Sequence, residues 1–214
     1  MTVQCKFTAI TELESQNNVW KRIQKGMPAG QLSFLLRAGS DTLPTPLNLR
    51  RWRLRPGTKC PLCGNLWPTV QHILNGCPVS LSQERYTWRH DSALKILAQG
   101  LGKCLQPGER LFADLPEMRA TDNPPATIPA EILDTSARPD IVIVGDGEIT
   151  LIELTVPYNS PDCLNWLPHT HSALRQQIPS LSKSTATQLL DLAAKAIVTA
   201  SHRIFCACLN PTWN

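Results

Sequence analysis

The chain has 214 residues, of which 42% are hydrophobic and 18% are charged, with a formal net charge of +4. This balance is typical of a globular protein and excludes an intrinsically disordered one. No run of about 18 apolar residues occurs and the N-terminal segment lacks an apolar signal core, so we expect neither a membrane span nor secretion. In an intracellular chain, the eight cysteines favour metal binding or free thiols over disulfides.

The charges are unevenly distributed along the chain. Residues 1–100 contain 13 Lys and Arg against 5 Asp and Glu, whereas residues 101–214 contain 8 against 12. A basic half followed by an acidic half is typical of a part that binds a polyanion joined to a metal-binding or enzymatic part. The alternative is a solvated surface whose charges are uneven but have no partner.

The N-terminal region is predicted to be helical over residues 11–37. A first helix is expected to end at Gly26, because glycine adopts the left-handed conformation that often terminates helices. A second is expected between Pro28 and Gly39, since proline begins helices and glycine ends them. A proline-containing loop is expected over residues 40–59.

The predicted loop contains a dense group of cations around Trp52. Arginine forms bidentate contacts with phosphates, and an indole ring can stack on a base. The pattern therefore predicts a nucleic-acid-binding segment, whereas the alternative places Trp52 in the core beside solvated arginines. The cations of this basic segment are Arg50, Arg51, Arg53, Arg55 and Lys59.

The stretch "CPLCGNLWPTVQHILNGC" has the spacing of a zinc site. Zinc prefers four thiolate or imidazole ligands in a tetrahedron, and a Cys-x2-Cys turn supplies two of them. Gly64 is expected to permit that tight turn, and a left-handed Gly76 is expected to end a short helix and turn the last cysteine back. The alternative is three buried thiols and a core histidine. The predicted ligands are Cys60, Cys63, His72 and Cys77.

An amphipathic helix is predicted from about Ser82 to about Leu101, because apolar residues recur there at helical spacing. Residues 106–139 are expected to form a loop. His90 and Cys104 stand apart from the motifs, and we expect both to be structural.

The stretch "RPDIVIVGDGEITLIELT" predicts two strands joined by a tight turn, since Asp-Gly is a strong hairpin signal. With the turn centred between Asp146 and Gly147, Asp140 faces Glu153, with Cβ atoms roughly 5 Å apart. Two such carboxylates repel each other unless a cation lies between them, and Mg²⁺ can bind in this way. In the alternative, Asp140 caps the strand and Glu153 pairs with an arginine.

Together these segments resemble the C-terminal region of non-LTR retrotransposon reverse transcriptases, in which a zinc knuckle precedes a restriction-like endonuclease domain. The knuckle followed by Arg-Pro-Asp-x12-Glu is the most specific element, and "RYTWRHDSALKIL" and "LLDLAAKAIVTASHRIFCACLNPTW" are also similar. The resemblance implies a nuclease that nicks target DNA before target-primed reverse transcription. It also implies that Asp140 and Glu153 bind the catalytic metal, and that the knuckle and basic segment bind DNA or RNA.

The sequence departs from this family in two ways. No polymerase palm motif is present, so the chain itself is not the polymerase. A lysine-bearing segment is missing after the second strand, as if deleted near residues 164–165, and Thr155 stands where a Glu-x-Lys pattern has lysine. The nuclease is therefore expected to be inactive or very weak, unless Lys183 replaces the lost lysine.

We therefore predict an α/β (α+β) protein with a basic helical segment over 1–58, a zinc knuckle over 59–80, and an incomplete restriction-endonuclease-like domain over 81–214. That last domain is expected to have a mixed sheet and a C-terminal helix. The predicted function is zinc-dependent nucleic-acid binding by a retroelement-derived protein, with Mg²⁺ as a second cofactor at the carboxylate pair. DNA, RNA or both are the expected partners, in the nucleus, without a membrane or a small-molecule substrate. The alternatives are an active Mg²⁺-dependent endonuclease and a retroelement relic without function.

Overall fold

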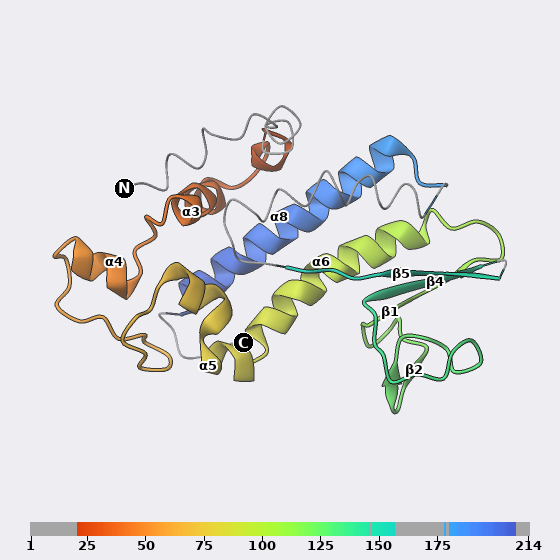
Figure 1. Cartoon of the computed structure of the whole chain (residues 1–214). Coiled ribbons are helices and arrows are strands. Elements are labelled where there is room, and N and C mark those ends of the chain that lie inside the picture. Colours follow the sequence, from red (N-terminus) through yellow and green to blue (C-terminus); the bar gives the residue numbers. More distant parts are fainter. Residues whose placement is uncertain (1–20, 146, 157–177, 179, 209–214) are drawn as a thin grey trace. The chain divides into compact units, whose positions relative to one another are not determined.

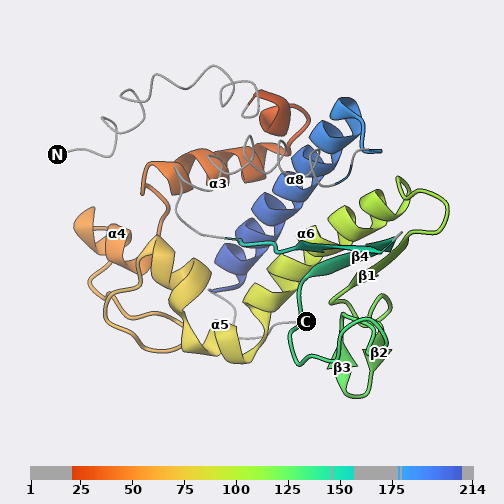
Figure 2. The ribbon, with the colours of Figure 1, turned by 45° about the vertical axis from the view of Figure 1, so that its right-hand side comes forward.

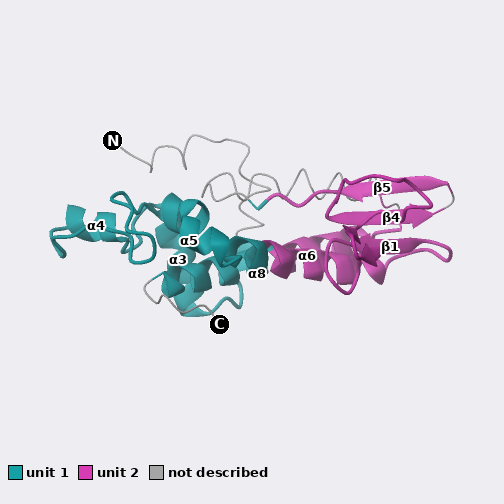
Figure 3. Ribbon diagram, turned by 90° about the horizontal axis from the view of Figure 1, so that it is seen from below, with its two compact units in different colours: residues 1–89, 156–168, 194–214 teal, residues 90–155, 169–193 magenta. Residues whose placement is uncertain are grey.

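The computed structural model describes residues 21–145, 147–156, 178 and 180–208. The chain divides into two compact units, coloured separately in Figure 3. Unit 1 consists of residues 1–89, 156–168 and 194–214, and unit 2 consists of residues 90–155 and 169–193. The beginning of the predicted N-terminal helix and the predicted deletion point near residues 164–165 lie outside the described residues.

The described part of unit 1 begins with the two predicted helical segments. Residues 21–24 are helical, and Gly26 follows with a φ of 76°, which confirms the predicted end of this helix. Helix α3 (Ala29–Gly39) begins directly after Pro28, also as predicted. Its buried Phe34 and Ala38 face the core of this unit.

A short helix, α4 (Pro46–Arg51), lies inside the segment that the sequence predicted to be a loop. The Thr45 hydroxyl accepts a hydrogen bond from the Asn48 N–H at 3.1 Å, and Pro46 occupies the first turn. Threonine at the cap followed by proline is a helix-start signal. The loop prediction was therefore wrong here, because the prolines were interpreted only as helix breakers.

The segment around the predicted zinc ligands forms a π-helix, η1 (His72–Gly76), followed by α5 (Pro78–Ser82) and α6 (Arg85–Gly102). The predicted amphipathic helix is confirmed, but it begins at Arg85 because Glu84 has a φ of 55°. The apolar stripe of α6 is buried at Leu94, Leu97, Ala98 and Leu101.

The core of unit 1 joins the zinc segment to the end of α8 (Lys183–Ala207), the long C-terminal helix seen in Figure 1. The Phe34 ring lies 5.3 Å from the His202 ring and 5.8 Å from the Phe205 ring, measured between centroids. Helix α8 therefore closes the core that supports the zinc segment. The buried members of this core are Phe34, Ala38, Leu43, Val70, Ile73, Leu74, Val198, Ile204 and Cys208.

Unit 2 contains a three-stranded antiparallel sheet with the strand order β1-β4-β5. Its strands are β1 (Arg110–Ala113), β4 (Ile141–Gly145) and β5 (Glu148–Ile152). Figure 3 labels all three strands, and Figure 2 shows β1 beside β4. The predicted hairpin and its register are confirmed, since Ile141 pairs with Ile152 and Gly145 with Glu148.

Two features of this unit differ from the prediction. The described sheets are antiparallel throughout, so the expected mixed sheet is not found among these residues. The predicted loop over 106–139 contains β1 and a two-stranded ribbon of β2 (Thr121–Asp122) and β3 (Pro125–Ala126). Strands of two to four residues are too short to show a clear alternation in sequence.

The combination of helices and small sheets confirms the predicted α/β class. Within the described part of the chain, no helix combines the length and the apolar character needed to cross a membrane.

Candidate metal centre and carboxylate pair

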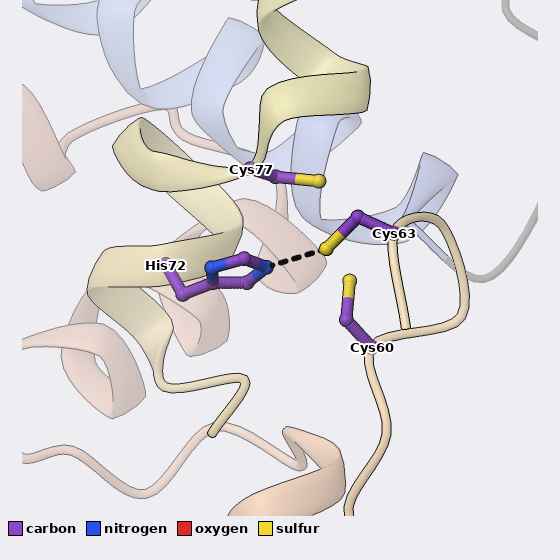
Figure 4. Close-up of side chains that lie close together, drawn as sticks. All are labelled: Cys60, Cys63, His72 and Cys77. Carbon is purple, nitrogen blue, oxygen red and sulfur yellow. Dashed lines mark hydrogen bonds between the residues drawn. The ribbon is translucent and has the colours of Figure 1, made fainter. Parts of the chain in front are cut away.

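The four predicted zinc ligands converge on one point in unit 1 (Figure 4). Their ligand atoms all lie within 4.8 Å of one another, and Cys63 Sγ is 3.3 Å from His72 Nε2. Bonds of about 2.3 Å from zinc to sulfur and about 2.0 Å to nitrogen place tetrahedral ligand atoms roughly 3.5–3.8 Å apart. The cluster therefore fits a zinc ion after a small contraction.

The Cys-x2-Cys turn folds tightly because of Gly64, which has a φ of 75°. The Gly64 N–H donates to the Cys60 carbonyl at 2.9 Å, and the Cys60 N–H donates to the Asn65 carbonyl at 2.8 Å. The role predicted for Gly64 is therefore confirmed, and the turn places both thiols on one side of the cluster.

The second ligand pair is held by the π-helix rather than by a left-handed glycine. Gly76 does not have a positive φ, so its predicted conformation was wrong. A π-helix has i→i+5 hydrogen bonds, and its wider turn brings residues five apart, such as His72 and Cys77, to one side. The Tyr86 hydroxyl supports this turn by accepting from the Cys77 N–H and donating to the Ile73 carbonyl, both at 3.0 Å.

Burial and hydrogen bonding change the pKa values of the cluster in different directions. Burial, together with the neighbouring thiols of Cys60 and Cys77, raises the pKa of Cys63 to about 11. Burial lowers the pKa of His72, which keeps its imidazole neutral and able to bind a metal. Burial opposes ionisation of Cys77, but hydrogen bonds from Ser80, Cys63 and Val79 together outweigh burial and lower the pKa of this thiol. A divalent metal displaces the remaining thiol protons and stabilises the thiolates.

A buried arginine lies beside the cluster and was not anticipated from the sequence. Arg85 is 0% exposed; its Nη1 donates to the Ala207 carbonyl at 3.1 Å, and its Nε donates to Gln83 Oε1 at 2.8 Å. Its charge interacts with Cys77 and Cys208. Because zinc with three thiolates and one imidazole has a net charge of −1, the guanidinium offsets the buried charge.

The side chains that define the basic segment are exposed. All five of its cations are exposed, and Trp52 is also exposed, at 41%, which excludes the alternative in which this indole anchors the core. Arg51 has local partners, since its Nη1 donates to Asn48 Oδ1 at 3.1 Å and lies 3.6 Å from Asp41 Oδ2. The segment ends at Lys59, next to the first zinc ligand.

In unit 2, the hairpin register brings the two predicted catalytic carboxylates together. Asp140 and Glu153 stand one position beyond the Ile141–Ile152 pair. Asp140 Oδ2 accepts from the Leu154 N–H at 2.5 Å. Burial and the nearby charge of Asp140 raise the pKa of Glu153, as expected for close carboxylates.

His90 occupies this site, although the sequence placed it apart from any motif. Its Nε2 lies 3.3 Å from Asp140 Oδ2 and 3.1 Å from the Leu154 carbonyl, and its Nδ1 lies 3.1 Å from Asp91 Oδ1. Both nitrogens therefore face acceptors, which only an imidazolium satisfies. Hydrogen bonds to Asp140 and Asp91 raise the pKa of His90 to about 10.

His90 thus supplies a cation to the carboxylate pair. Among the described residues, the Cys3His cluster is the one group of three or more His, Cys, Asp or Glu side chains whose ligand atoms converge for a metal. Cys104 was expected to be structural. Its thiol donates to the Gly100 carbonyl at 3.5 Å, at the C-terminal end of α6.

Comparison with known proteins identifies one family. A family model described as zinc-binding in reverse transcriptase matches residues 2–83, which include all four ligands. No curated protein and no solved structure matched the chain. Residues 2–83 are therefore similar to the zinc-binding domain of reverse transcriptases, and the described part of this match contains the Cys/His cluster of Cys60, Cys63, His72 and Cys77.

Proposed function

We propose that this chain is a retroelement-derived protein that binds nucleic acid through its basic segment, and that a structural zinc ion maintains the binding surface. The observation that supports the proposal most strongly is the direct connection between the two features. Lys59, the last cation of the basic segment, precedes the ligand Cys60, whose N–H is fixed by the knuckle turn.

The other end of the basic segment is also fixed by buried contacts. The side chain of Asn48, which is 3% exposed, donates to the carbonyls of Asp41 at 2.8 Å and Leu43 at 3.0 Å. The N–H groups of Leu54 and Arg55 donate to the Leu49 carbonyl. The cations therefore project from a backbone that is held at both ends, and a preordered surface loses less entropy on binding.

Zinc removal is expected to release one of these ends. The free energy of metal binding at a knuckle is largely free energy of folding. Without the metal, the Cys60 turn loses its link to η1, and Lys59 and Arg55 lose their fixed positions. Nucleic-acid affinity should then fall even though the number of positive charges is unchanged.

We further propose that the endonuclease-like part is degenerate and that its carboxylate pair does not bind Mg²⁺. Mg²⁺ requires oxygen ligands in near-octahedral geometry. At Asp140, one carboxylate oxygen already accepts from a backbone N–H and contacts the imidazolium of His90. The charged groups with the largest influence on the pKa of Glu153 are Asp140 and His90. An active nuclease would need to displace His90 and recruit a lysine such as Lys183.

Binding of a fluorescein-labelled oligonucleotide tests the main proposal by anisotropy. The zinc-loaded full chain should bind, and dialysis against a chelator should weaken binding at least tenfold, with recovery when zinc is restored. The double variant R50A/R55A should weaken binding without loss of zinc, and K95A, an exposed lysine of unit 2, is the matched control. Equal binding with and without zinc would contradict the proposal.

A further inference from the structure

A hollow of about 530 Å³ opens where the basic segment meets the zinc knuckle. Its wall includes Pro46, Arg55, Pro56, Thr58, Lys59 and Leu66. Three parts of unit 1 therefore form the wall: the start of α4, the end of the basic segment, and the loop that runs from Cys63 to η1.

The chemistry of this wall is divided between apolar surface and positive charge. Two proline rings and the Leu66 side chain, which is 57% exposed, provide apolar surface. Arg55 and Lys59 are both exposed and provide cations at the same hollow. A nucleotide matches this division, because its base is flat and largely apolar while its phosphate is anionic.

We propose that this hollow accepts one unpaired nucleobase, so that the basic surface prefers single-stranded nucleic acid to a duplex. The inference rests on the proposed function and specifies its ligand. In a duplex the bases are stacked inside the helix, and only phosphates are within reach of Arg55 and Lys59. In a single strand a base can enter against Pro56 and Leu66 while the adjoining phosphates contact the two cations.

Two exposed indoles extend the same interpretation. Trp67 is 66% exposed and directly follows Leu66, and Trp52 is 41% exposed within the basic segment. Exposed aromatic rings among cations are typical of surfaces on which successive unpaired bases stack. Leu54, which lies between Arg53 and Arg55, is also 69% exposed and adds apolar surface to the basic segment.

The test compares three labelled ligands of equal length with the zinc-loaded full chain: a single strand, its duplex, and a single strand with abasic sites. We expect the single strand to bind about tenfold more tightly than the abasic strand and the duplex, as loss of one or two stacked bases predicts. L66S should weaken single-strand binding about tenfold and leave duplex binding unchanged. L81S, which changes a leucine that is 64% exposed on α5, is the matched control. Comparison of DNA and RNA single strands identifies the preferred sugar.

The outcomes separate this inference from the proposed function. One outcome is that all three ligands bind equally, that L66S binds like the wild type, and that R50A/R55A binds more weakly. This outcome would overturn the proposal that the hollow accepts a base and would leave the proposed function intact. Absence of binding to any ligand would overturn both. The zinc content and circular dichroism of L66S should match those of the wild type, because Leu66 is exposed. If L66S loses zinc, L66T replaces it in the same comparison.

Discussion

His90 Nε2 lies 3.3 Å from Asp140 Oδ2, so the histidine of α6 supplies the positive charge that the carboxylates of the hairpin require. The sequence led us to expect a metal between Asp140 and Glu153. The structure places the His90 ring beside Asp140, and this ring also contacts Asp91. This pairing joins the start of α6 to the end of the hairpin and supports our proposal that the carboxylates do not bind Mg²⁺.

We predict that H90Q destabilises the protein in a pH-dependent way. The pKa of His90 is about 10 in the folded state, against about 6.5 for an unperturbed histidine. Because the pKa of His90 is higher in the folded state, its charge contributes its full stabilisation of the fold below about pH 6.5. This stabilisation is lost as the pH rises through 10. The difference in free energy of unfolding between wild type and H90Q should be about 1.5–3 kcal/mol at about pH 6, the usual contribution of a hydrogen bond to a charged group.

Urea unfolding of both proteins at several pH values between about 6 and 10 measures this difference. Comparing the two proteins at each pH cancels the titration of the groups they share. A difference that stays constant with pH would show that His90 is neutral and that its charge does not stabilise the site.

We predict that the chain does not cleave DNA at a useful rate. Cleavage needs a metal at the carboxylates and a group that offsets the charge developing on the phosphate; loss of one such group costs on the order of 10²–10³ in rate. A supercoiled plasmid assay with Mg²⁺ or Mn²⁺ should show no nicking above that of D140A and E153A. Robust nicking that both substitutions abolish would contradict this, and K183A would then be the next variant.

The basic segment should determine how strongly nucleic-acid affinity depends on salt. Each phosphate contact on duplex DNA contributes about 0.9 to the slope of log K against log salt concentration. The double variant R50A/R55A should therefore flatten the slope by about 1.8, and K95A should leave it unchanged. An unchanged slope in the double variant would mean that these exposed arginines are only solvated.

The packing of α6 against α8 within unit 2 depends on a glycine. A Cβ added at Gly100 would collide with the Leu189 side chain, whereas one added at Gly102 meets no atom within 4 Å. G100A should destabilise the protein by about 1–3 kcal/mol through overpacking, and G102A, the matched control, should not. Thermal unfolding checks this pair. Alanine also favours a helix more than glycine does, so G102A is the reference, and equal melting temperatures for G100A and G102A would exclude close packing at Gly100.

The parts of the fold that were predictable depend on local patterns. The Gly26 helix end, the apolar stripe of α6 and the hairpin register follow from residue preferences within a few positions. Helix α4 was also predictable in principle, because Thr45 and Pro46 form a helix-start signal. The short strand β1 was not, because it is stabilised by pairing with β4, about 30 residues later in the chain.

The metal site was predictable in its ligands but not in its geometry. The spacing of three cysteines and one histidine predicted the four side chains that converge, whereas the π-helix is supported by Tyr86, a residue outside the motif. His90 and Arg85 were missed for the same reason, since their partners lie 50 and 122 residues away along the chain. The neighbouring Asp91 was the one local indication that His90 is charged.

The Cys3His cluster is expected to bind one zinc ion that maintains the proposed nucleic-acid-binding surface. The most direct measurement is the zinc content of the purified full chain by mass spectrometry under native conditions, for wild type and C63S, with C104S as the matched control outside the cluster. We predict one zinc ion per chain in wild type and C104S, and loss of zinc in C63S. Wild-type protein without zinc, or C63S that retains zinc, would show that the Cys3His cluster is not a zinc site.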